Sequence, residues 1–174
     1  MGLRPAHCIR ELTKRPWTRF SRKKPKKSYI KAMPHPDLVV YRMGDGKKKY
    51  SAVFHLRTAD GVVLRDNAIE SARQAVNKYL ERMILGQYYF VVRVYPHHII
   101  RENKMIAGAG ADRLQKGMRQ SFGRPTDRAA RLQKGTALFT VYASEQHTAV
   151  IETAFERSMR KLSGKWRVVK QAAA

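Results

Sequence analysis

The chain has 174 residues, of which 36 are Lys or Arg and 13 are Asp or Glu, and its formal net charge is +23 at pH 7. A compact chain with this charge repels itself unless a polyanion screens it, so the expected partner is nucleic acid or an anionic membrane surface. No apolar run approaches the ~18 residues of a membrane span, and the first 36 residues contain no apolar signal-peptide core. We therefore expect nucleic acid, no membrane partner and a cytoplasmic location.

Composition indicates one folded domain with a basic extension. An apolar share of 43% is enough for a hydrophobic core, and a chain of this length is usually a single domain. We expect the domain to span residues 37–170, followed by a short tail at 171–174. Residues 1–36 hold eleven basic residues, one acid and five prolines. Because proline interrupts helices, this segment is predicted to be an extended basic arm.

Runs of apolar and β-branched residues predict the strands. They lie at 38–43, 50–58, 62–64, 88–95, 128–132, 136–142 and 165–170. The Asp60-Gly61 pair stands between two such runs, which is a strong short-range signal for a hairpin.

Two helices are predicted from apolar residues at helical spacing. The first opens at Asp66-Asn67, where Asn67 and Glu70 resemble a capping box, and ends near Gly86. The second spans about 144–162. Hairpin-forming strands with a helix after each of two strand groups predict an α+β fold, in which both helices pack on one face of a mainly antiparallel sheet.

The segment 101–125 is predicted to be a long basic loop that projects from the domain. It contains Gly108, Gly110, Gly117 and Gly123 among six basic residues and has no lasting period. Loops of this length are uncommon in compact domains and are usually functional or disordered. Its glycines lack the spacing of a dinucleotide fingerprint, but they permit close approach of the backbone to a phosphate.

Residues for catalysis are scarce. Most of the acids fall in turns or on helices, and no two of the remainder are brought together by local geometry, which disfavours a two-metal nuclease site. His97 and His98 point to opposite faces of an extended segment, so one is expected to pack and the other to face RNA. A single cysteine excludes a disulfide and a cysteine zinc site. We therefore predict no enzyme activity, no metal, no cofactor and no small-molecule substrate.

Two aromatic residues of the arm, Trp17 and Phe20, have two possible roles. They could stack on splayed RNA bases, or they could attach the arm to the domain.

Several segments resemble one protein family. The start LRPAHCIRELTKRPWTR, the predicted helix LRDNAIESARQAVNKYL and the segment VVRVYPHHIIRENKMIAGAGADRLQKGMRQSFGRP are similar to the large-subunit ribosomal protein ten-e family of archaea and eukaryotes. Its bacterial counterpart is large-subunit ribosomal protein sixteen. ARLQKGTALFTVYA continues the resemblance, which covers about residues 3–169. The arm and the intact loop, without an extended tail after Trp166, favour an archaeal member.

The resemblance implies a structural constituent of the large ribosomal subunit. Such a protein would bind 23S-type rRNA near the aminoacyl-tRNA site and the peptidyl transferase centre, contact neighbouring ribosomal proteins and help to position tRNA. The predicted rRNA contacts are Arg4, Arg10, Arg15, Trp17, Arg19, Arg22, Lys23, Lys24, Lys26, Lys27, His97, Arg113, Lys116, Arg119, Arg124 and Arg128. The residues predicted to lie toward tRNA and the peptidyl transferase centre are Arg101, Asn103, Lys104, Gly108 and Gly110.

Two other functions remain open. One is an enzyme that modifies or cleaves RNA, which would require a catalytic cluster. The other is a free nucleic-acid compaction or assembly factor, which would not co-sediment with large subunits.

Overall fold

The computed structural model describes residues 9, 12–14, 17–104, 108 and 123–172. Its largest element is an antiparallel sheet of five strands in the order β1-β4-β7-β2-β8. The strands are β1 (Arg42–Gly44), β2 (Ala52–Thr58), β4 (Tyr88–Val92), β7 (Ala137–Ala143) and β8 (Trp166–Ala172). The last strand thus continues past residue 170, to Ala172.

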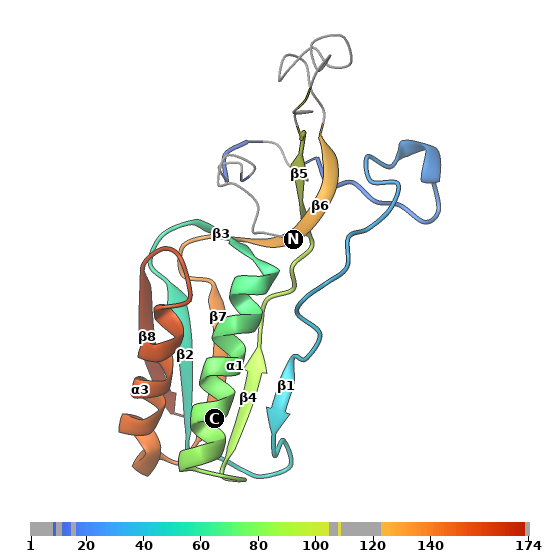
Figure 1. Ribbon diagram of the computed structural model, residues 1–174. Coiled ribbons are helices and arrows are strands. Elements are labelled where there is room, and N and C mark those ends of the chain that lie inside the picture. Colours follow the sequence, from blue (N-terminus) through green and yellow to red (C-terminus); the bar gives the residue numbers. More distant parts are fainter. Residues whose placement is uncertain (1–8, 10–11, 15–16, 105–107, 109–122, 173–174) are drawn as a thin grey trace.

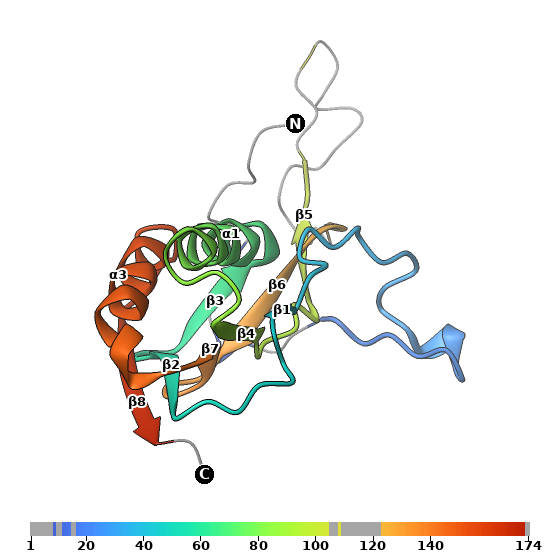
Figure 2. The ribbon, with the colours of Figure 1, turned by 90° about the horizontal axis from the view of Figure 1, so that it is seen from below.

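Both α-helices, α1 (Asp66–Met83) and α3 (Thr148–Met159), lie on the same face of this sheet (Figure 2). The apolar residues of α1 repeat at helical spacing, and Ile69 and Leu80 are completely buried. They meet sheet residues such as Phe54 and Phe139 in one core. Short 3-10 turns occur at Pro25–Lys27 (η2) and at Glu145–His147 (η3). The predicted α+β architecture with both helices on one face is confirmed.

A smaller antiparallel sheet adjoins the body in the order β3-β6-β5. Its strands are β3 (Val62–Arg65), β5 (His98–Glu102) and β6 (Arg124–Leu132). In Figure 1, β5 and β6 extend together away from the helices, at the top of the view. Glu102 pairs with Arg124 where the two strands end, so segment 103–123 connects the strands of a projecting hairpin.

The predicted hairpin at Asp60-Gly61 is wrong, because β2 and β3 belong to different sheets. The end of β2 bonds elsewhere: Thr58 N donates to Thr136 O at 3.0 Å and Ala59 N donates to Lys165 O at 2.8 Å. β3 pairs with β6 instead. Pairing partners distant in sequence thus override a good local turn signal.

The predicted capping box is also wrong. Helix α1 begins at Asp66, its N-cap residue is Arg65 rather than Asn67, and the Arg65 side chain makes no capping hydrogen bond. Asp66 is buried, and its carboxylate accepts hydrogen bonds from Asp37 N and Asn67 N, both at 3.0 Å. Burial raises the pKa of this carboxyl above its usual value. The carboxylate therefore joins the start of the domain to the start of α1. At the other end, Gly86 adopts a φ of +71° just after the helix, as predicted.

Candidate nucleic-acid interface

The arm contains a closed loop of residues 19–29, here named the basic loop. Tyr29 N donates to Arg19 O at 2.8 Å, and Ser21 N donates to the Ser28 hydroxyl at 2.9 Å. These bonds join the two ends of the loop, so its side chains project outward. The exposed basic residues that it presents are Arg19, Arg22, Lys23, Lys24, Lys26 and Lys27. All six are among the predicted rRNA contacts.

The two aromatic residues of the arm differ in their surroundings. Trp17 packs edge-on against Tyr29, with ring centroids 5.1 Å apart and an interplanar angle of 79°. Phe20 is 45% exposed. Trp17 therefore helps to close the basic loop at its base, whereas Phe20 keeps an accessible ring that could stack on a base.

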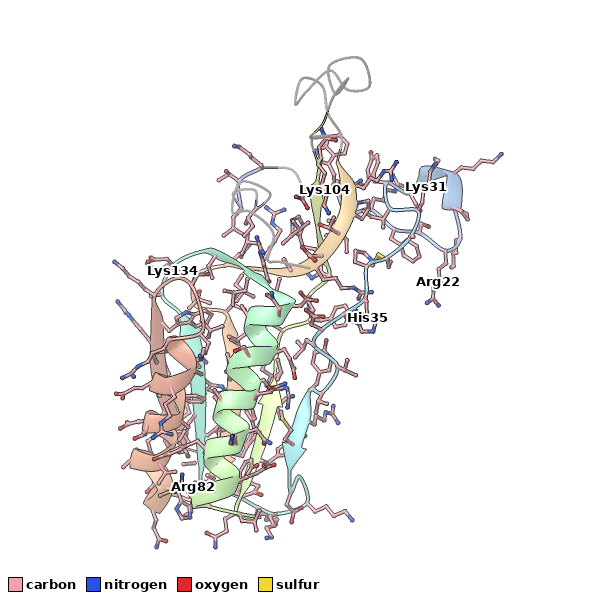
Figure 3. The ribbon with its side chains drawn as sticks, viewed as in Figure 1. Arg22, Lys31, His35, Arg82, Lys104 and Lys134 are labelled. Carbon is pink, nitrogen blue, oxygen red and sulfur yellow. The ribbon has the colours of Figure 1, made fainter. Side chains whose placement is uncertain are left out.

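Three arginines of the smaller sheet, here named the anchor arginines, bond the arm to the domain. Arg101 donates to Tyr29 O at 2.5 Å, Arg128 donates to Pro34 O at 2.7 Å, and Arg131 donates to Leu12 O. Each is a charge-assisted bond to a backbone carbonyl, which is stronger than a neutral one. The basic loop is thereby held beside the projecting hairpin, away from the helices (Figure 3, where Arg22 and Lys31 lie far from Arg82).

Two of the anchor arginines, Arg101 and Arg128, are among the predicted contacts. Arg128 is only 8% exposed, and it also donates to the Tyr95 hydroxyl at 3.0 Å. Arg101 also donates to Gly123 O at 2.9 Å. Both guanidinium groups thus bond within the chain. Arg131 was not predicted, since nothing in the sequence indicates that its partner is a carbonyl of the arm.

The backbones of the two strands of the projecting hairpin approach each other closely at Glu102 and Gly123. A Cβ added to Gly123 would lie 2.6 Å from the carbonyl carbon of Glu102, so only glycine fits this approach without displacement. Lys104 and Arg124 are exposed at this end, and Asn103 is partly buried. Gly108 has nothing within 4 Å of an added Cβ.

The two adjacent histidines face different environments. His98 is 7% exposed, and His97 is exposed, with Nδ1 3.3 Å from Tyr95 O. The expectation that one imidazole packs is confirmed, and contact of the other with RNA remains a prediction. Seven other predicted residues lie outside the described part of the chain: Arg4, Arg10, Arg15, Gly110, Arg113, Lys116 and Arg119.

The charges are distributed unevenly between the layers. The two α-helices together hold five acidic and four basic residues, so their layer is almost neutral in a chain of net charge +23. Some of these charges pair locally, as in the bidentate contact of Arg73 with Glu70. The positive excess therefore belongs to the arm, the sheets and the connecting segments.

The described residues also bear on the requirements of a metal site and of a membrane span. The described residues include no group of three or more His, Cys, Asp or Glu side chains that could hold a metal ion. No helix among them is both long enough and apolar enough to cross a membrane.

Fold and charge together define an α+β protein that presents a preformed basic loop beside a projecting hairpin, away from an almost neutral helical layer. Residues 17–169 match the family model described as ribosomal protein L16p/L10e. The chain is 41% identical over 170 residues to the large ribosomal subunit protein uL16 of Staphylothermus marinus, covering 97% of this chain and 94% of that protein. It is 43% identical over 164 residues to the uL16 of Hyperthermus butylicus, covering 93% and 89% respectively.

The uL16 of Methanococcus aeolicus is 40% identical over 171 residues, covering 97% of this chain and 94% of that protein. The chain therefore belongs to the ribosomal protein L16p/L10e family. This confirms the resemblance seen in the sequence, including its archaeal character, because these relatives are archaeal.

Proposed function

We propose that this chain is a non-enzymatic structural constituent of the large ribosomal subunit in the cytoplasm, where it binds large-subunit rRNA. The observation that carries the proposal is the basic loop, which presents six exposed cations on a backbone closed by its own hydrogen bonds. Family membership supports the choice of rRNA as the polyanion.

The loop's geometry suits phosphate contact. A cation that contacts a phosphate releases condensed counterions, and this release drives much of the binding. Because the loop is already closed and bonded to the smaller sheet, less conformational entropy is lost when it meets RNA. The sharper form of the proposal is that the arm and segment 101–125 bind near the aminoacyl-tRNA site and the peptidyl transferase centre. There the segment helps to position tRNA, and neighbouring ribosomal proteins contact the rest of the body.

The test compares two variants in which basic residues become glutamine. One changes Arg22 and Lys23 of the basic loop, and the matched control changes Lys78 and Arg82, which are exposed on α1. Binding to large-subunit rRNA is measured over a range of salt concentrations. The slope of log affinity against log salt is negative, and we expect the loop variant to make it shallower by about 0.7–0.9 for each phosphate that is no longer neutralised. The control should leave the slope unchanged.

Equal slopes for the wild type and the loop variant would overturn the rRNA role of the basic loop. Sedimentation addresses the alternatives: stoichiometric migration with large subunits in high salt supports a resident constituent, and absence from them supports a free compaction factor. Turnover of rRNA by the purified protein would instead indicate an enzyme.

A further inference from the structure

Both helices lie on one side of the five-stranded sheet (Figure 2). We call the opposite side the open face, because no helix of the described residues covers it. Side chains alternate along each strand. Since Phe54 and Leu56 of β2 are buried in the core, His55 and Arg57 belong to the open face. The same reasoning places Arg42 of β1 and Arg167 of β8 there. None of the described positions that alternation assigns to this face in the five strands is Asp or Glu.

Like charges stand directly opposite each other on this face. Arg57 of β2 is the cross-strand partner of Arg167 of β8, an arrangement that destabilises an antiparallel pair. Within the described structure, the side chains of Arg57 and Arg167 make no hydrogen bond and no ion pair, and neither does that of Arg42. Arg57 Nε is moreover buried without a partner. The free chain therefore holds two opposed, unpaired guanidinium groups, Arg57 and Arg167, and a third, Arg42, on the same face. An anionic ligand would relieve the repulsion between the opposed pair.

The centre of the same face is held in place by a chain of hydrogen bonds across four strands. Arg93, just after β4, donates from Nε to the Thr140 hydroxyl at 3.1 Å. The Thr140 hydroxyl is 3.0 Å from His55 Nδ1, and His55 Nε2 is 3.1 Å from Gln171 Oε1. One assignment satisfies every group: the hydroxyl donates to Nδ1, and Nε2 donates to the amide oxygen. The imidazole is then neutral, and the face is rigid.

An aromatic pair completes the face. The rings of Tyr89 and Tyr142 are 5.6 Å apart and tilted by 32°, and Arg93 also donates to the Tyr142 hydroxyl at 2.5 Å. Arginine and tyrosine side chains are among the donors that proteins use on phosphate and sugar oxygens. The open face thus carries the chemistry of a nucleic-acid contact, on the larger sheet rather than on the arm.

We propose that the open sheet face, with Arg42, Arg57 and Arg167, is a second rRNA-binding surface that contacts the sugar–phosphate backbone. The inference rests on the proposed function for the identity of the polyanion, but it assigns a different surface from the basic loop and the projecting hairpin. An RNA partner fits better than a protein partner because the face has only positive charge, whereas the helical layer is almost neutral. The protein would then contact rRNA with one layer and leave its helices to other neighbours.

The test neutralises the opposed arginines in the variant Arg57→Gln/Arg167→Gln of the full chain. Its matched control is Lys78→Gln/Arg82→Gln on α1, which removes the same charge from the helical layer. Affinity for purified large-subunit rRNA is measured against salt. We expect the sheet variant to make the negative slope shallower by about 0.7–0.9 for each arginine that had neutralised a phosphate, and the control to match the wild type.

Two further measurements separate RNA contact from structural damage. Thermal unfolding of the RNA-free sheet variant should occur at the same temperature as the wild type or higher, since like-charge repulsion has been removed. The charge-preserving variant Arg57→Lys/Arg167→Lys should keep the wild-type slope, because phosphate contact by a point charge survives.

Three outcomes would overturn the inference. They are a sheet variant with the wild-type slope, a control whose slope becomes as shallow as that of the sheet variant, and a lysine variant that behaves like the glutamine one. If the wild type binds rRNA and the slope becomes shallower in the basic-loop variant but not in the sheet variant, the second surface fails and the proposed function stands. If the wild type shows no salt-dependent binding to rRNA, the proposed function itself fails.

Discussion

The body and the projecting end of this molecule are held together by different forces. In the body, the helices and the five-stranded sheet bury a continuous apolar core that includes Phe54, Phe90, Phe139 and Phe155. At the projecting end, the anchor arginines donate to backbone carbonyls of the arm. Apolar burial is strong but has little directionality, whereas hydrogen bonds from arginine fix orientation. The body therefore supplies stability, and the arginines supply position.

The largest effect should come from emptying the core of the body. Phe139 is completely buried and packs edge-on against Phe90, with centroids 5.2 Å apart. Phe139→Ala should lower the free energy of unfolding by about 3–5 kcal/mol, because apolar burial is reduced and a cavity is left behind. The free energy of unfolding is measured by urea titration, with circular dichroism as the signal. Met83→Ala is the control, because Met83 is 51% exposed and should cost less than about 0.5 kcal/mol. Similar destabilisation by the two substitutions would contradict the division of roles.

Substitution of an anchor arginine should have a smaller effect on stability, but it should change the position of the arm relative to the domain. Arg128→Ala removes the donors to Pro34 O and to the Tyr95 hydroxyl, which should cost about 1.5–3 kcal/mol. The arm should detach locally while the body remains folded, so limited proteolysis should cut within 28–36 faster than in the wild type. Arg124→Ala in the same strand is the control, because that side chain is exposed. An unchanged cleavage rate in Arg128→Ala would show that the arm is held by other contacts.

The sequence predicts the body better than the projecting end, for a physical reason. Helix α1 is visible because Ile69, Ala72, Val76 and Leu80 repeat at the helical period, a local property. The sequence does not show that the chain passes from β2 into the second sheet, because that step depends on pairing with strands far along the chain.

The sequence likewise predicts some residues of the candidate interface correctly as exposed and misjudges the surroundings of others. The cations of the basic loop were predicted from the basic composition of the arm and from the family resemblance, and the structure shows that they are exposed. Their contact with rRNA stays a prediction. Arg128 was expected to meet RNA, whereas in the structure it donates to Pro34 O; sequence identifies a donor without identifying its acceptor. The open-face arginines were not among the predicted contacts, because an arginine inside a strand of alternating pattern looks like an ordinary solvated residue.

The smallest predicted effect is a pH dependence of stability caused by His55. It tests whether hydrogen bonds hold the open sheet face in place, as packing holds the body, or whether its side chains are solvated. Burial, followed by the nearby charges of Arg57 and Arg93, lowers the pKa of His55 below its ordinary value, although the bond with Gln171 opposes this. Because the folded-state pKa is below the unfolded one, the fold favours the neutral imidazole. This contribution to stability is present above the ordinary value of about 6.5 and is lost as the pH falls through the folded-state pKa.

The measurement is the urea midpoint between pH 8 and pH 5, compared with His55→Gln, which cannot titrate at that position. Subtracting the two profiles removes the contributions of the other histidines, provided that they do not couple to His55. We expect the wild type to lose more stability than the variant on acidification, because protonated Nδ1 can no longer accept from Thr140 and a new cation would join Arg57, Arg93 and Arg167 on one face. Parallel profiles would mean that His55 is solvated like an ordinary surface histidine, and the face would then lack the rigid polar centre inferred from its hydrogen bonds. With bound rRNA the difference between the profiles should shrink, since phosphates near the face would offset the added charge.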